Sequence, residues 1–345
     1  MSASVTFKCP SCGAYLEFDP SAGRFACPYC GAQLDEAELL RQSAAKEQAA
    51  PAAKADAMRG YHCQSCGAEI VTGDTTAATR CYYCHSPVVL TDRLSEDFRP
   101  DGVIPFAIDE KQAREKFDRF IAQKRFVDRR FFSKDQLTCF SGVYYPYWYG
   151  EVEGDGAFVG NGTRTDVSHT PRETLTITKH FRVTRRGHLR FGGMVRKALK
   201  ANDRKLSDGI FPYEEGQMKP FAAGYLSGFL AEKRDVDEAD AAADMAREAQ
   251  GAAESVLRQG AAYDTLTGQA SFTKTGAKLR YVLLPTWVLT YKGDRPGTTY
   301  FYMMNGQKGT VCGKLPVNKA KLALWSAGCG LAVFALLCLG GALLW

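Results

Sequence analysis

The chain has 345 residues, 45% of them hydrophobic and 24% charged, which is ordinary for globular protein and long enough for two or three domains. A formal net charge of +6 is too small to identify an anionic partner unless the basic residues cluster. The stretch from Met1 to Pro10 lacks the basic start and apolar run of a signal peptide, which argues against a secreted, disulfide-bonded protein.

Two groups of four cysteines open the chain, and each has the spacing C-x2-C-x14-C-x2-C. They are Cys9, Cys12, Cys27 and Cys30, followed by Cys63, Cys66, Cys81 and Cys84. Two residues between cysteines let both thiolates of a tight turn reach one ion, and four thiolates complete the tetrahedron that structural Zn²⁺ prefers. We therefore expect two zinc ribbons, at residues 1–34 and 61–92, with two structural zinc ions.

Each ribbon of about 25 residues is too small to bury a core that folds unaided. Bound metal must therefore supply much of the folding free energy, roughly 10 kcal/mol or more in zinc-finger peptides. Glycine follows the second cysteine of three pairs, at Gly13, Gly31 and Gly67, where a positive φ turns the chain back under the metal.

Two other readings of the cysteines remain open. The segment 81–85, with Cys81, Cys84 and His85, matches the C-x-x-C-H of covalent haem attachment, but that reading needs export and leaves Cys63 and Cys66 without a role. A thioredoxin-like redox pair lacks a βαβ context around any of the motifs. The repeated spacing favours zinc over both.

Residues 35–60 join the ribbons and are rich in Ala, Glu, Gln and Lys. This composition favours helix but offers few large apolar residues to bury. We expect an exposed helical or flexible linker, which would let the two ribbons engage a partner bivalently.

Residues 98–320 are expected to form one mixed α+β body with an internal duplication, its repeats covering about 98–165 and 205–312. Pro146 and Trp148 precede Gly154-Asp155 with the same spacing as Pro285 and Trp287 precede Gly293-Asp294, and Asn161-Gly162 and Asn305-Gly306 follow later. The aromatic and β-branched runs around these landmarks predict strands joined by turns. The landmark residues are then structural.

A helix is expected upstream of the strands in each repeat. The first runs from Asp109 to Lys124, and the second from Asp235 to Gln259. Their apolar faces are expected to hold Ala113, Phe117, Phe120 and Ile121 in the first helix, and Met245, Ala249 and Val256 in the second.

A basic stretch occupies Arg182 to Lys205, with Asp203 as its only acid. It includes Arg185, Arg186, Arg190, Arg196, Lys197, Lys200 and Arg204. Nucleic-acid backbone and anionic lipid headgroups would both fit such a stretch, and so would a solvated hairpin face. Its two aromatic residues, Phe181 and Phe191, are too few for a base-stacking platform.

The sequence predicts no enzyme. It contains no P-loop, H-E-x-x-H, G-x-S-x-G or kinase signature, and the glycines from Gly154 to Gly160 miss the dinucleotide fingerprint by one residue. Cys139 and Cys312 have no histidine nearby in sequence, so small core residues explain them better than nucleophiles do. A hidden active site in the body would need a deep pocket with converging polar groups.

Residues 322–345 contain no charged residue, and 24 helical residues span about 36 Å, enough to cross a bilayer. Trp325 and Trp345 stand where interfacial aromatic residues belong, and Lys314, Lys319 and Lys321 precede the span. We expect a tail-anchored protein of the inner membrane with its N-terminus and body in the cytoplasm.

The doubled ribbons, the P-x-W-x5-G-D and N-G-Q-x-G stretches, the segment from Tyr225 to Glu232 and the terminal span resemble a bacterial family. Its members are membrane-anchored, TFIIB-type zinc ribbon-containing proteins, often labelled primosomal or helicase-like. The resemblance covers nearly the whole chain and implies work with phage-shock or flotillin-like membrane proteins. The helicase label does not fit, because an ATP-driven motor needs a phosphate-binding loop.

Together these features predict a non-enzymatic, membrane-anchored adaptor whose ribbons bind protein partners at the inner face of the bacterial membrane, in envelope-stress or membrane-organisation assemblies. The alternative is a membrane-tethered nucleic-acid-binding protein that uses the ribbons and residues 182–205. A small-molecule substrate is not expected.

Overall fold

A computed structural model describes residues 6–35, 37–38, 41, 59–63, 69–72, 75–81, 86–90, 94, 98–127, 140–200, 207–259, 263–292, 299–313 and 317–344. Several sequence predictions fall outside these residues. They concern Cys66, Cys84, Cys139, Gly293-Asp294 and nearly all of the linker at 35–60.

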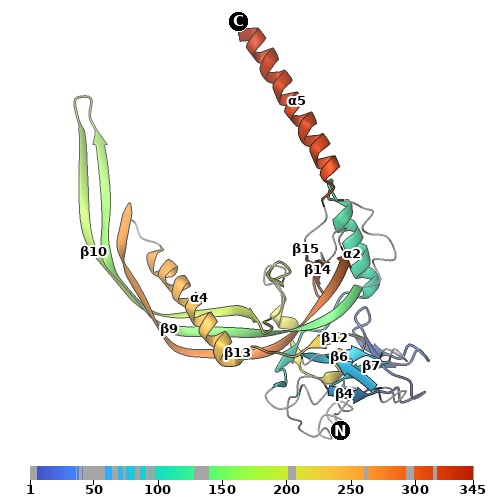
Figure 1. Cartoon of the computed structure of the whole chain (residues 1–345). Helices are drawn as coiled ribbons and strands as arrows, with labels where there is room; N and C mark the ends of the chain where they lie inside the picture. The colour runs from blue at the N-terminus through green and yellow to red at the C-terminus, as the bar shows by residue number, and fades with distance from the viewer. Residues whose placement is uncertain are drawn as a thin grey trace.

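The architecture is mixed α+β, with a small N-terminal sheet, a large central sheet, and an apolar helix at the C-terminal end (Figure 1). The central sheet has ten strands, in the order β11-β8-β13-β9-β12-β6-β7, with β10 on β9 and with β14 and β15 beside β13. Its strands are β6 (Thr76–Arg80), β7 (Pro87–Val89), β8 (Gly102–Val103), β9 (Phe140–His169), β10 (Thr174–Lys197), β11 (Lys219–Pro220), β12 (Leu230–Glu232), β13 (Thr265–Lys292), β14 (Thr299–Asn305) and β15 (Val311–Gly313).

Three of these strands are very long and give the molecule its extended form. β9 and β10 form an antiparallel hairpin whose register runs from the pair Tyr147 and Lys197 to the pair His169 and Thr174. β13 pairs with the other edge of β9 as far as Thr163. Beyond Thr163 the hairpin consists of β9 and β10 alone among the described strands. We call residues 154–189, which project away from the body, the hairpin arm (Figure 1).

The turns expected at Gly154-Asp155 and Asn161-Gly162 are absent, because both pairs lie inside the unbroken strand β9. These glycines serve close approach instead. A Cβ at Gly154 would lie 2.6 Å from the ring of Phe272 on β13, and a Cβ at Gly268 would lie 2.5 Å from the Cα of Gly160 opposite it. The turn predicted at Asn305-Gly306 is confirmed. Asn305 ends β14, and its side-chain oxygen accepts hydrogen bonds from the amides of Gln307 and Lys308.

Helix α2 (Glu110–Ala122) confirms the first predicted helix. Asp109 caps its N-terminus by accepting a hydrogen bond from the Gln112 amide at 2.7 Å, and the Gln112 side chain completes a capping box. Ala113, Phe117 and Ile121 are buried along one face, while Phe120 is half-buried.

Helix α4 (Glu238–Arg258) confirms the second predicted helix and lies along β9, β10 and β13. Its buried stripe is mostly alanine, which lets the helix lie close to the sheet. The buried residues are Ala241, Met245, Ala249, Ala253 and Leu257. The placement of Val256 on this face was wrong: it is 44% exposed, because it directly precedes Leu257 and therefore lies off the stripe.

The helices and strands of the body repeat a pattern around the β9 and β13 pair. β8 precedes α2 and pairs in parallel with β13, while β12 precedes α4 and pairs in parallel with β9. Tyr145, the residue before Pro146, pairs with Leu284, the residue before Pro285. The two P-x-W stretches therefore meet in a common register and run apart from this point of the ladder.

The two tryptophans of the P-x-W stretches make matching hydrogen bonds across this pattern. The indole N–H of Trp148 on β9 donates to the Val236 carbonyl at 3.0 Å, just before the N-cap Asp237 of α4. The indole N–H of Trp287 on β13 donates to the Ile108 carbonyl at 3.0 Å, just before the N-cap Asp109 of α2. Each strand thus holds the start of a helix from the other half.

Helix α5 (Lys319–Leu344) leaves the body as an isolated rod (Figure 1). The stretch Lys319–Cys338 has a mean hydropathy of 1.8, and none of its most apolar window is buried against the body. By length and composition it is long and apolar enough to cross a membrane.

Candidate metal centre

The first four cysteines lie in turns beside a small three-stranded sheet, and we call residues 6–34 ribbon 1. Its strands are β1 (Glu17–Asp19), β2 (Arg24–Ala26) and β3 (Gln33–Leu34). The amide of Cys9 donates to the Ala14 carbonyl at 2.6 Å, and the amide of Cys27 donates to the Ala32 carbonyl at 2.9 Å. Gly13 and Gly31 have φ of +76° and +72°, which confirms the expected turns beneath the cysteines.

The four sulfur atoms of ribbon 1 converge on one point, all within 4.8 Å of one another. The Sγ atoms of Cys9 and Cys30 are 3.7 Å apart, and those of Cys12 and Cys27 are 3.5 Å apart. A tetrahedral ion with Zn–S bonds of about 2.3 Å requires sulfur separations of about 3.8 Å. The donor set and its dimensions therefore fit one structural Zn²⁺ with no position left open for a substrate.

Hydrogen bonds around the cysteines alter the pKa values of their thiols and favour the thiolate form, which binds a cation, at Cys9 and Cys27. Burial opposes ionisation of Cys9, but the amides of Cys12 and Ser11 and the thiols of Cys30 and Cys12 lower the pKa of Cys9 to about 6. The Cys30 amide lowers the pKa of Cys27 in the same way, against burial. The Ala14 amide favours ionised Cys12, but burial and its three neighbouring thiols raise the pKa of Cys12 to about 12, so it ionises last.

Acidification is expected to release zinc from ribbon 1. Folding lowers the pKa of Cys9 from its ordinary value of 9.0 to about 6, so ionised Cys9 stabilises the folded ribbon fully above pH 9.0. This stabilisation is lost as the pH falls through about 6. Cys9 is therefore ionised at pH 7, and protons compete for its sulfur below pH 6. A chromophoric zinc indicator followed from pH 8 to pH 4 measures the release, and half-release above pH 7 would contradict this assignment.

Ribbon 1 packs on the body through the segment from Tyr225 to Glu232, whose role the sequence did not reveal. The Phe18 amide donates to the Ser227 carbonyl at 3.1 Å, and the Ser227 hydroxyl donates to the Leu16 carbonyl. Phe18 and Phe25 pack against the buried ring of Tyr225, with centroids 5.5 and 5.7 Å away. Hydrogen bonds between segments far apart in the chain leave no periodic pattern in the sequence, so the sequence does not predict them.

A second link joins ribbon 1 to strand β6. Arg80 forms an ion pair with Glu17 at 3.0 Å and donates to the Gly228 carbonyl at 2.8 Å. The Thr6 hydroxyl also donates to the Pro87 carbonyl on β7 at 3.2 Å. Ribbon 1 is therefore held by the body and by the hairpin of β6 and β7, and is not an independent head on a tether.

Replacing Gly228 by valine is expected to loosen ribbon 1 while leaving its zinc bound. Gly228 has φ of +95°, and a Cβ there would lie 3.2 Å from the Cβ of Glu17. Limited proteolysis should cut residues 35–60 faster in Gly228→Val than in the native protein, with zinc content unchanged. Gly216→Val is the matched control, because nothing lies within 4 Å of a Cβ there. Equal cleavage rates in all three proteins would contradict the packing described.

The second cysteine group is described in part. Cys63 follows β4 (Arg59–His62), which pairs with β5 (Glu69–Thr72), and Cys81 follows β6. Both cysteines lie in one buried cluster with Tyr61, Val88 and Leu90. The Cys81 amide donates to the Ser86 carbonyl at 3.0 Å, five residues on, as the Cys9 and Cys27 amides do in ribbon 1.

Comparison with known proteins agrees with ribbon 1 and extends to the body. Residues 5–38 match the family model of the FORGETTER1 second zinc ribbon domain. The uncharacterized protein YdjG of Bacillus subtilis (strain 168) is 30% identical over 247 residues, which cover 70% of each chain. The chain belongs to the YdjG family. No solved structure matches it.

In this YdjG-family chain residues 182–197 of the basic stretch lie on β10, and several of its cations are held within the protein. Arg185 donates to the carbonyls of Leu257 and Gln259 at 2.7 and 2.6 Å, at the C-terminal end of α4. Arg190 pairs with Glu151, and Arg196 pairs with Glu248. Lys197 lies over the ring of Tyr145 at 4.7 Å. Residues 201–205 lie outside the described part, and nucleic-acid binding stays a prediction.

Proposed function

We propose that this protein is a non-enzymatic adaptor, anchored in the inner membrane of a bacterium, that binds cytoplasmic protein partners. The observation that carries the proposal is the contrast between its two ends. At one end, four cysteines form a closed structural metal site packed against the body. At the other, an apolar helix contacts the body near its start and then projects from it, with none of its most apolar window buried. Such a chain holds a folded surface at a fixed distance from a membrane.

The second cysteine group completes a second zinc ribbon in this proposal, with Cys63, Cys66, Cys81 and Cys84 as ligands. Its support is the shared spacing, the joint burial of Cys63 and Cys81, and the bond from Cys81 to Ser86 that repeats the turn of ribbon 1. Metal analysis should find two zinc ions per chain and no haem absorbance. One zinc ion per native chain would overturn the second site.

The body is, in the same proposal, a degenerate duplication of a strand, helix and long strand. The common register and the matching tryptophan bonds support it. Two pockets occupy corresponding places: one of about 410 Å³ beside Trp148 and Glu238, and one of about 380 Å³ beside Trp287 and Glu110. Glu17 and Phe18 of ribbon 1 line only the second pocket, so the two halves present different surfaces.

The membrane assignment places α5 across the bilayer and the remainder in the cytoplasm. It rests on the length and composition of α5, on the lysines at its start, and on the absence of acidic residues after Asp294. The resemblance to TFIIB-type zinc ribbon-containing membrane proteins leads us to propose phage-shock or flotillin-like proteins as partners.

Crosslinking in intact cells, followed by purification of the full-length protein and mass spectrometry, tests the adaptor. Native protein is compared with Cys27→Ser, which breaks ribbon 1, and with Cys312→Ser, which leaves it intact. We expect partners that survive nuclease treatment and that Cys27→Ser loses. An identical partner set in all three proteins would overturn the role of the ribbon, and partners lost on nuclease treatment would favour nucleic-acid binding.

A further inference from the structure

The segment that follows α2, residues 124–127, holds the start of helix α5 in place. The Asn318 amide donates to the Phe126 carbonyl at 2.7 Å, and Val127 and Val317 form an antiparallel bridge. About two turns further along, in α5, the ring of Trp325 lies edge-on to Phe126, with centroids 6.3 Å apart. Segments far apart in the sequence thus meet where the proposed span begins.

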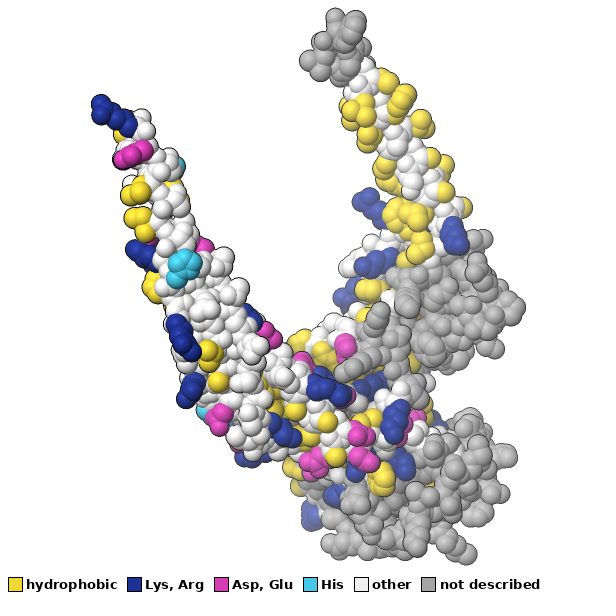
Figure 2. Space-filling model, turned by 60° about the vertical axis from the view of Figure 1, so that its left-hand side comes forward, with side chains coloured by type: hydrophobic (Ala, Val, Ile, Leu, Met, Phe, Trp, Pro, Cys, Tyr) yellow, Lys and Arg dark blue, Asp and Glu magenta, His cyan; other side chains and the backbone are white. Residues whose placement is uncertain are grey.

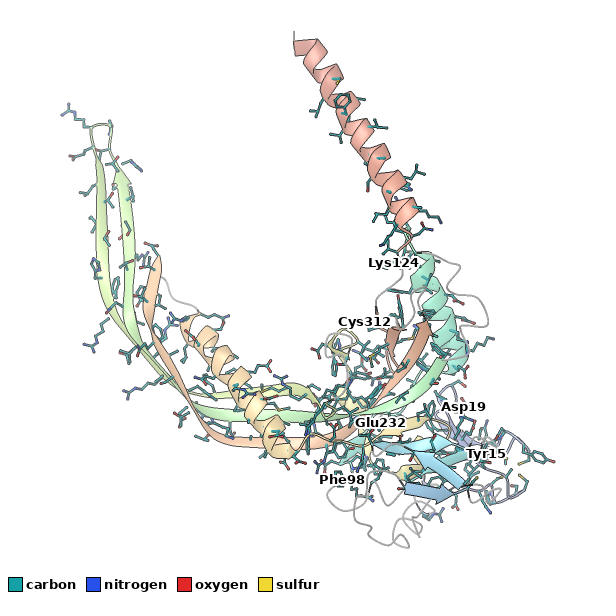
Figure 3. The ribbon with its side chains drawn as sticks, in the orientation of Figure 1. Tyr15, Asp19, Phe98, Lys124, Glu232 and Cys312 are labelled. Atoms are coloured by element: carbon teal, nitrogen blue, oxygen red, sulfur yellow. The ribbon has the colours of Figure 1, made fainter. Side chains whose placement is uncertain are left out.

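Four cations surround this junction, two from each segment. Lys124 and Arg125 follow α2, and Lys319 and Lys321 lie in the first turn of α5; all four side chains are exposed. Figure 2 shows lysine and arginine side chains gathered around the start of α5, and Figure 3 shows Lys124 at the end of α2 beside it. The Arg125 guanidinium lies over the Trp325 ring at 5.9 Å.

Within the described residues 119–127 and 317–344, which form this junction, all charged side chains are basic. Residues 119–127 and 317–344 contain no Asp or Glu, and the nearest acid along α2 is Asp118. Trp325 is 54% exposed although it contacts both Phe126 and Arg125. An exposed tryptophan beside cations at the start of an apolar helix is typical of the boundary between hydrocarbon and headgroups.

We propose that Lys124, Arg125, Lys319 and Lys321 form a binding site for the phosphate groups of anionic phospholipids, with the end of α2 lying in the headgroup layer. This inference rests on the proposed membrane span. Lysines next to a span follow the positive-inside rule and orient any such helix. Lys124 and Arg125 are different, because only the fold brings them to the membrane surface. The occupant is lipid, since the site adjoins the helix that would enter the bilayer.

Each cation near an anionic membrane surface strengthens binding roughly fivefold. Neutralising both Lys124 and Arg125 is therefore expected to weaken the retention of anionic lipid by about 25-fold. The test compares the full-length native protein with the double variant Lys124→Gln, Arg125→Gln. Its matched control is Lys274→Gln, Lys278→Gln, which removes two exposed cations of β13.

The proteins are placed in vesicles of phosphatidylcholine containing phosphatidylglycerol, extracted in mild detergent, and examined for retained lipid by native mass spectrometry. Zinc content confirms that the variants fold. We expect phosphatidylglycerol to be enriched on the native protein and the control, and lost from the double variant. Equal retention by all three overturns the lipid site alone. Failure of the native protein to resist alkaline extraction from vesicles overturns the proposed span, and the lipid site with it.

Discussion

Replacing Cys27 by serine is expected to remove one zinc ion per chain and to unfold ribbon 1. Cys27 is buried, and its sulfur lies 3.5 Å from that of Cys12. A three-ligand site with a serine binds zinc far more weakly, and metal supplies roughly 10 kcal/mol or more of folding free energy in ribbons of this size. The core of ribbon 1, including Phe18 and Phe25, then loses its support on Tyr225.

Zinc content by elemental analysis and limited proteolysis within residues 6–34 measure this effect. Cys312→Ser is the control, because Cys312 is half-buried on β15, away from Tyr15 and Asp19 of ribbon 1 (Figure 3). It should keep all of the zinc found in the native protein. A Cys27→Ser protein with native zinc content would show that the four sulfurs do not form the site. Protease resistance after zinc loss would show that the body alone keeps ribbon 1 folded.

Replacing Trp287 by alanine is expected to destabilise the body by about 3–5 kcal/mol. Trp287 is 4% exposed and stacks on Phe140, with centroids 5.2 Å apart and planes inclined by 10°. Phe106 packs on it at 5.1 Å. The substitution leaves a cavity among these rings and removes the indole N–H from the Ile108 carbonyl beside the start of α2.

Thermal unfolding of the full-length protein in detergent, followed by circular dichroism, should show a midpoint lowered by on the order of 10 °C. Trp148→Ala, at the matching position on β9, should lower it similarly, because Trp148 is also 4% exposed and bonds to Val236. Trp325→Ala is the control, since Trp325 lies outside the body core. An unchanged midpoint in Trp287→Ala would show that this aromatic cluster does not determine the stability of the body.

Much of this structure could be predicted from local patterns. Cysteine spacing identified the ribbon 1 site because ligand geometry is encoded within a few residues of each thiol. Both body helices followed from their apolar periodicity, and Asp109, the first residue of the predicted helix, is the N-cap of α2. The apolar span was evident from composition alone. In each case the information lies within one element.

The remainder depended on contacts that no local pattern encodes. Gly154 and Asn161-Gly162 look like turn residues, yet each is paired with β13 inside strand β9, and only this pairing determines their role. Arg185 and Arg196 look like a cationic surface, but α4 supplies their partners. Ser227 and Gly228 contact ribbon 1, although they lie far from it in the sequence. These are features of tertiary packing, which overrides what each segment favours alone.

The length of β9 gives the body mechanical leverage. Thirty residues at a rise of about 3.3 Å give a strand with a contour length of about 100 Å, which curves from the body near ribbon 1 to the hairpin (Figure 1). The straight distance from base to tip is shorter than this contour, but a tilt of a few degrees at the base still displaces the tip by several ångströms. Leu230 on β12 pairs with Val143 near the base of β9, two residues beyond Gly228, which contacts ribbon 1. A small rotation of ribbon 1 against the body would therefore produce a larger displacement of the hairpin tip, to which a second molecule bound at the tip could respond.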